Sequence, residues 1–70
     1  MEIPVNADGR FVAVDPYGLD VGEGVVGDTE VQFTHRAIGG SAESTAVVPR
    51  AEFEALFDDP PFELELRPAP

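Results

Sequence analysis

Apolar side chains alternate with polar ones in several short runs, and glycine-containing turns separate these runs. The most regular run covers residues 30–38, where every second side chain is expected on one face. A period of two residues is typical of a β-strand, because successive side chains of a strand point to opposite faces. The run therefore predicts a strand within an antiparallel meander. Its core-facing side chains are expected to be Val31, Phe33, His35 and Ala37.

Further strands are expected on both sides of this run. Residues 3–5 and 10–14 flank the segment Asn-Ala-Asp-Gly, which is typical of a type I turn closed by a left-handed glycine, so they are predicted to form a first hairpin. A weaker strand is expected over residues 19–26, where two internal glycines indicate a bend or a bulge. A two-residue turn at 27–28 leads into the central run, and the next strand is predicted over 44–48.

One short helix is expected before the last strand. Residues 50–58 carry three apolar side chains at the i, i+3, i+4 spacing of a buried helical stripe, and two prolines then prevent continuation. Alternation returns over 62–67, and the tail 68–70 is expected to fray. The chain, residues 1–70, is thus predicted to be a single domain, mainly β (α+β), whose meander closes into an SH3-like barrel. The helical stripe consists of Phe53, Leu56 and Phe57.

The chain is strongly acidic. Fourteen aspartate and glutamate residues face four basic residues, all arginine, and the formal net charge is -10. Such self-repulsion needs a salty solvent that screens it or a cationic partner that neutralises it. Because the acidic residues are scattered along the chain, we interpret the charge as the solvent adaptation of a halophile-type cytosolic protein. A field of this sign repels phosphates, so no direct nucleic-acid partner is expected.

The sequence contains no apolar run near the roughly 20 residues that a membrane-spanning helix needs. Its first residues also lack the basic and apolar regions of a secretory signal. We therefore expect a cytoplasmic location and no membrane partner.

No residue pattern points to catalysis. The chain has no cysteine, which excludes disulfides and thiolate zinc sites, and it has one histidine. His35 as a general base held by Glu30 is an alternative, but the two side chains fall on opposite faces of their strand, which favours a structural histidine. Asp15, Asp20 and Glu23 lack the spacing of an EF-hand calcium loop. The sequence predicts no enzyme, no cofactor and no metal site.

The densest acidic stretch lies on the predicted helix and last strand. It is interpreted either as a solvated outer face or as a row of carboxylates that occupies a groove built for phosphates. The leading hypothesis is a non-enzymatic protein-interaction or regulatory accessory module, and the alternative is an acidic nucleic-acid mimic that inhibits a DNA- or RNA-binding protein. Pairing of an exposed strand edge, 3–5 or 44–48, with a partner strand is a further mode of recognition, and a homodimer stays open. The candidate partner-binding residues are Glu52, Glu54, Asp58, Asp59, Glu63 and Glu65.

Overall fold

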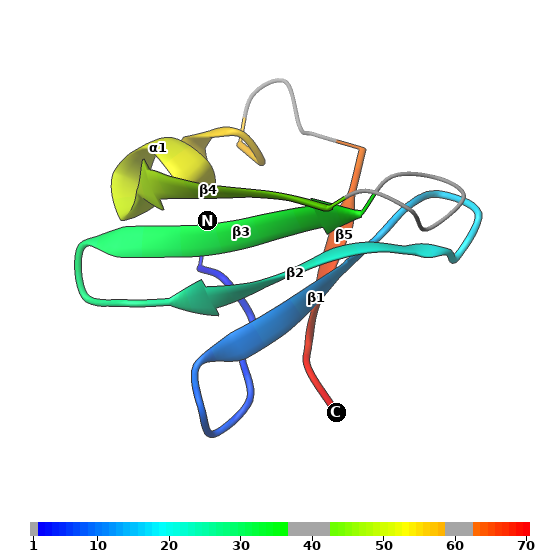
Figure 1. Cartoon of the computed structure of the whole chain (residues 1–70), viewed down its shortest axis with the longest axis horizontal. Coiled ribbons are helices and arrows are strands. Elements are labelled where there is room, and N and C mark those ends of the chain that lie inside the picture. The colour runs from blue at the N-terminus through cyan, green and yellow to red at the C-terminus, as the bar shows by residue number, and fades with distance from the viewer. Residues whose placement is uncertain (1, 37–42, 59–62) are drawn as a thin grey trace.

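The structure is a computed structural model, and it describes residues 2–36, 43–58 and 63–70. The described residues form a mainly β fold with a single short helix, as predicted (Figure 1). All strand pairs are antiparallel, and the sheet order is β4-β3-β2-β1-β5. The elements are β1 (Arg10–Val14), β2 (Asp20–Val26), β3 (Glu30–Arg36), β4 (Glu43–Pro49), α1 (Arg50–Ala55) and β5 (Glu65–Pro68).

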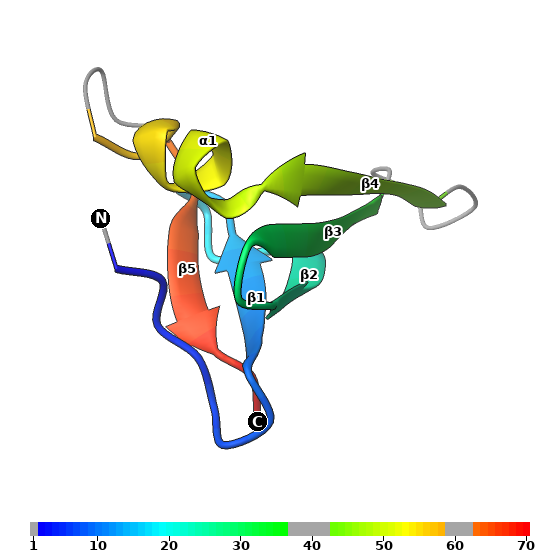
Figure 2. The ribbon, with the colours of Figure 1, turned by 90° about the vertical axis from the view of Figure 1, so that its left-hand side faces the viewer.

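The sheet is open, so the predicted closure into an SH3-like barrel is not confirmed. β4 and β5 lie at opposite edges, and β5 pairs with β1 alone. Figure 2 shows these two edge strands running in clearly different directions, as expected of a strongly twisted sheet. A barrel needs ladder hydrogen bonds between its first and last strands, and the described parts of β4 and β5 make none.

The turn of the predicted first hairpin forms, but the strand before it does not. The Asn6 amide donates to the Arg10 carbonyl at 2.9 Å, and Gly9 closes the turn with a left-handed φ of 76°. The preceding segment has no strand, because β5 occupies the free side of β1. Pro4 also has no N–H to donate to a ladder. Ile3 is nevertheless buried in the core.

The β1–β2 connection repeats the same turn. The Asp15 amide donates to the Leu19 carbonyl at 2.9 Å, and Gly18 has a left-handed φ of 84°. The Asp15 carboxylate accepts the amide hydrogens of Tyr17 and Leu19, each at 2.9 Å. In each of the two loops, the side chain of the first residue, Asn6 or Asp15, accepts amide hydrogens from later residues of the loop and so stabilises the turn. The turn signals in the sequence are therefore correct.

Several predicted boundaries shift. The turn between β2 and β3 consists of Asp28 and Thr29 rather than residues 27–28, because the Gly27 amide donates to the Glu30 carbonyl at 2.8 Å. α1 ends at Ala55 rather than near residue 58, and the next three amides donate to carbonyls three residues back at 3.2–3.3 Å, which is a tightened helical end. The ends of the predicted runs 30–38 and 62–67 lie partly outside the described residues. Pro68 is the last residue of β5, and fraying of the tail stays a prediction.

An aromatic cluster occupies the face of the sheet that α1 covers. The ring of Phe11 from β1 stacks on that of Phe33 from β3, with centroids 6.1 Å apart and planes 9° apart. Phe53 from α1 contacts both rings at centroid distances of 5.6 and 5.7 Å. The six residues of the buried cluster are Ile3, Phe11, Ala13, Val31, Phe53 and Leu66.

Two glycines of β2 make room for these rings. Gly24 is paired with Phe11 on one side and with Phe33 on the other; the Phe11 ring lies over Gly24 and the Phe33 ring over Gly22. A Cβ atom on Gly24 would overlap the Phe11 ring, and one on Gly22 would lie 2.7 Å from Cζ of Phe33. The register also shifts beside Gly22, where Val21 is left without a partner in β1. The bulge reading of these glycines is therefore supported, and their larger role is to accept aromatic rings.

We predict that Gly24→Ala destabilises the protein by about 1–3 kcal/mol, because the added methyl group overpacks the aromatic cluster. The measurement is urea unfolding followed by circular dichroism. Gly27→Ala is the matched control, since its Cβ would meet only the Glu30 carbonyl, at 3.2 Å. Equal stability of the two variants would contradict the ring-accommodating role of Gly24.

Candidate partner-binding site

β4 is an exposed edge strand. It pairs with β3 along all 7 of its residues, and in the described part of the chain no strand pairs with its other side. Six of the seven residues are exposed, and Val48 is half-buried. Figures 1 and 2 show no other strand beyond it. The predicted edge over residues 44–48 is thus confirmed as an edge, whereas the predicted edge over 3–5 is wrong because that segment is not a strand.

The register shows which backbone groups of β4 face outward. The Gly27 amide donates to the Glu30 carbonyl at 2.8 Å, so Glu30 directs its backbone groups toward β2. Alternate residues of an antiparallel strand direct these groups to opposite sides, so Phe33 faces β4, where its partner is Ala46. The neighbours of Ala46 then present their N–H and C=O groups at the free edge. The outward-directed groups belong to Glu43, Thr45 and Val47.

β5, at the opposite edge, offers a partner strand fewer backbone groups. It has 4 residues and ends at Pro68, which has no N–H. The chain just beyond it is held by Asn6, whose side-chain amide donates to the Ala69 carbonyl at 3.3 Å, and by Arg10, whose carbonyl accepts the Ala69 amide at 3.1 Å. Figure 2 shows the N-terminal segment running along this strand. β4 is therefore the edge that is open to a partner.

An apolar cavity of about 150 Å³ lies next to β4 on the core face. Ala46 and Val48 contribute from the edge strand itself, and the other lining residues come from β3, α1 with the turn after it, and the residues at the start of β5. Leu56 is 49% exposed, so the cavity opens to solvent beside it. Its lining consists of Phe33, Ala46, Val48, Phe53, Leu56, Phe57, Leu64 and Leu66.

The candidate acidic residues are only partly available. Glu54 is half-buried and accepts a hydrogen bond from Arg50 at 3.4 Å, and Glu65 accepts one from Arg67 at 3.0 Å. The hydrogen bond from Arg67 lowers the pKa of Glu65 below its ordinary value. Arginines therefore neutralise two members of the proposed row. Of the others, Glu52, Asp58 and Glu63 are exposed, and Asp59 lies outside the described residues.

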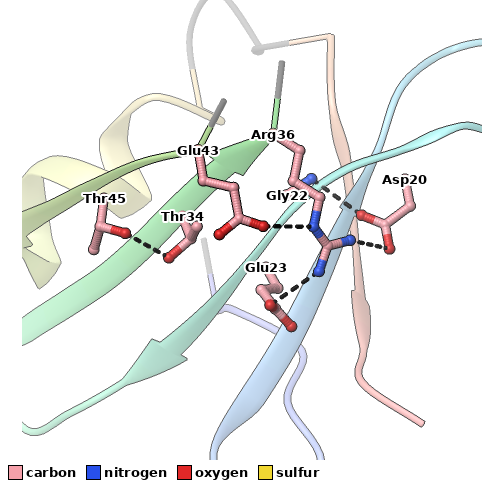
Figure 3. Close-up of polar contacts among 7 residues, drawn as sticks. All are labelled: Asp20, Gly22, Glu23, Thr34, Arg36, Glu43 and Thr45. Carbon is pink, nitrogen blue, oxygen red and sulfur yellow. Dashed lines mark hydrogen bonds and ion pairs between the residues drawn. The ribbon is translucent and has the colours of Figure 1, made fainter. Parts of the chain in front are cut away.

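Arg36, the last residue of β3, contacts residues of both neighbouring strands, β2 and β4. Its guanidinium lies 3.0 Å from Asp20 and 2.9 Å from Glu23, both of β2, and 3.8 Å from Glu43, the first residue of β4 (Figure 3). The carboxylates of Asp20 and then Glu23 raise the pKa of Arg36. One cation thus offsets repulsion among three carboxylates and ties β4 to the sheet. The sequence analysis missed this cluster, because its members are brought together only by the strand register.

His35 lies on the core-facing side of β3 but beyond the core. It is exposed, and its neighbours in the register are Gly22 and Ser44. His35 is therefore on the predicted side of the strand but outside the core, whereas Val31 is buried and Phe33 packs against the core. Two small cross-strand neighbours leave the imidazole uncovered.

The described residues contain no cluster of three or more histidine, aspartate or glutamate side chains with metal-binding geometry. In the same part of the chain, no helix has the length and apolar character needed to cross a membrane. No protein family, curated protein or solved structure shows significant similarity to the chain. Function is therefore inferred from the site itself.

We predict that Arg36→Gln lowers the thermal midpoint in dilute salt, because Asp20, Glu23 and Glu43 then repel one another. The loss should shrink at about 2 M KCl, where the screening length is only a few ångströms. Thermal unfolding by circular dichroism measures it. The control is Arg67→Gln, which removes a contact to Glu65 alone. A decrease in the thermal midpoint that is the same in dilute salt and in KCl would contradict the electrostatic role of Arg36.

We also predict that Ala46→Pro and Val47→Pro differ in stability. Proline at residue 46 removes a bond to β3, which destabilises the protein by about 1–3 kcal/mol, whereas proline at residue 47 removes only an outward N–H. Urea unfolding of the two variants tests the assignment. Equal losses, or a larger loss for Val47→Pro, would show that the outward and inward residues are reversed.

Proposed function

We propose that this chain is a non-enzymatic protein-interaction module that binds an extended segment of another protein along the outer edge of β4. The observation that carries the proposal is the free edge itself, a strand of 7 residues that is paired on one side and has six exposed residues. Natural sheets usually protect such edges, because unpaired N–H and C=O groups recruit further strands. An uncovered edge of this length is suited to strand addition.

The rest of the fold holds this edge ready. The ladder with β3 keeps β4 extended, the hydroxyl groups of Thr34 and Thr45 lie 2.9 Å apart, and Arg36 contacts Glu43 where β4 begins. At the other end, the Arg50 amide donates to the Thr29 carbonyl at 2.9 Å. Because the strand is ordered before binding, the partner segment alone loses conformational entropy, which favours affinity.

The proposal includes a halophile-type cytosolic setting. Strong net charge also disfavours pairing of two copies of the chain along β4, so a different protein is the expected partner rather than a homodimer. The wild-type unfolding curves of the Arg36 experiment test the halophile-type setting. A thermal midpoint of the wild-type protein that does not rise with KCl would contradict solvent adaptation.

The SH3-like architecture remains the finer fold assignment of this proposal. Its support is that β5, the next element after the short helix, pairs with β1, and that the register between β1 and β2 shifts at a bulge. This assignment adds nothing about function, because one fold serves many functions.

The nucleic-acid mimic is the weaker alternative. A mimic needs a row of free carboxylates, and arginines engage Glu54 and Glu65 within the candidate stretch. The exposed carboxylates of Glu52 and Glu63 support it. This alternative predicts that the partner no longer binds when Glu63 and Glu65 are both changed to arginine.

The test is affinity capture from native cytosol with immobilised wild-type protein, Val47→Thr and Val47→Pro. The threonine variant is the matched control, because it keeps the outward N–H that the proline variant lacks. We expect a partner that wild-type protein and Val47→Thr retain and Val47→Pro loses, in both about 0.1 M and about 2 M KCl. Retention of every captured protein by all three forms would refute strand addition. A partner released by salt and by the two arginine substitutions, but not by Val47→Pro, would establish the mimic.

A further inference from the structure

We infer that the apolar cavity beside β4 receives one large apolar side chain from the added strand, and that lysine or arginine residues flank this side chain in the partner. The inference rests on the proposed function, since it assumes that a strand binds at β4. It adds the chemistry of the segment that is recognised.

The position of the cavity relative to the edge carries the first step. Ala46 and Val48 line the cavity and also belong to the edge strand. In an added strand, every second side chain falls on this same face, with Cβ atoms about 4.5–5.5 Å from those of the opposing residues. The short side chain of Ala46 leaves a path over it. A long side chain opposite or diagonal to Ala46 therefore reaches the cavity.

The size and lining of the cavity set the kind of side chain. All eight lining residues are apolar, so the space offers a polar group no partner. An engineered protein cavity of about 150 Å³ with an apolar lining binds benzene, which is the size of a phenylalanine ring. The cavity here has the same volume, about 150 Å³. Phenylalanine or a residue of similar bulk is the expected occupant.

The net charge of the chain sets the flanking residues. Each end of the edge carries a glutamate and an arginine, since Glu43 lies 3.8 Å from Arg36 and Glu30 is paired with Pro49, which precedes Arg50. Both glutamates are exposed, and the whole chain carries a net charge of -10. A partner segment with a cationic residue at each end gains from this field, whereas an acidic segment is repelled.

The probe is a set of three capped synthetic peptides with the sequences KTVTFTK, KTVTATK and ETVTFTE. Their alternating pattern places the valine and phenylalanine on one face and the threonines on the other. Nuclear magnetic resonance titration of the 15N-labelled full chain measures affinity and locates the bound peptide. We expect KTVTFTK to shift the amides of Thr45 and Val47. Replacing its phenylalanine by alanine should weaken binding at least tenfold, through lost apolar burial.

ETVTFTE should bind more weakly than KTVTFTK in dilute salt, and the two should converge at about 2 M KCl because of screening. Two protein variants separate the edge from the cavity. Val47→Pro should abolish binding of both KTVTFTK and KTVTATK. Ala46→Leu fills the cavity from β4, keeps the outward backbone groups and should remove the difference between these two peptides. Circular dichroism verifies that each variant is folded, and the peptide comparison on the wild-type chain stands without them.

The outcomes distinguish the two levels of the argument. If KTVTFTK and KTVTATK bind equally tightly and Val47→Pro abolishes both, the edge binds strands but the cavity takes no partner side chain, as when a segment of this chain fills it. If none of the peptides binds at any salt concentration, both the inference and strand addition fail. If the size of the peptide-free protein, measured by light scattering, increases with its concentration, the occupant is a second copy of the chain. That result would overturn the proposal of a heterologous partner.

Discussion

The stacking of Phe11 on Phe33 across Gly24 is the contact on which the rest of the structure depends. β2 lies between the two strands that carry these rings, and a side chain at Gly24 would overlap the Phe11 ring, whereas one at Gly22 would overlap the Phe33 ring. Their stacked rings offer Phe53 one continuous apolar surface, with centroid distances of 5.6 and 5.7 Å, and this contact docks α1. In a chain this small and this acidic, the aromatic cluster supplies much of the apolar burial that opposes charge repulsion and chain entropy.

Docking of α1 on this cluster also determines where the surface is left uncovered. The helix follows β4 without a linker and covers the core beside it, so the free backbone edge of β4 and the cavity next to Ala46 lie on the same side of the molecule. Arg36, at the far end of β3, holds the start of β4 against the sheet through Glu43. The ladder with β3 holds the open edge along its whole length, an ion pair and a helix lie at its two ends, and it stays extended without a strand on its outer side.

The local features were predictable because they depend on neighbouring residues. Alternation identified β3 and β4, the glycine turns identified both loops that flank β1, and the spacing of Phe53 and Phe57 identified the helix. Apart from shifted element boundaries, the failures involve distant residues. Residues 3–5 have a strand-like pattern, but β5 takes their place beside β1. His35 has the alternation of a core residue, yet only glycine and serine lie beside it in the sheet. Asp20, Glu23 and Glu43 meet at Arg36 through a register that no local pattern reveals.

By itself, the sequence determined the strand periodicity, the turns on both sides of β1, the helix and the acidic composition, because each follows from residues close together in the chain or from composition. Tertiary structure alone decided which strands became edges, because that depends on which pairings exclude one another across the whole sheet. It also decided that an apolar cavity borders β4, since its lining gathers residues from 33 to 66. The site proposed for a partner thus combines a strand that the sequence predicts with an exposure and a neighbouring cavity that only the packed fold creates.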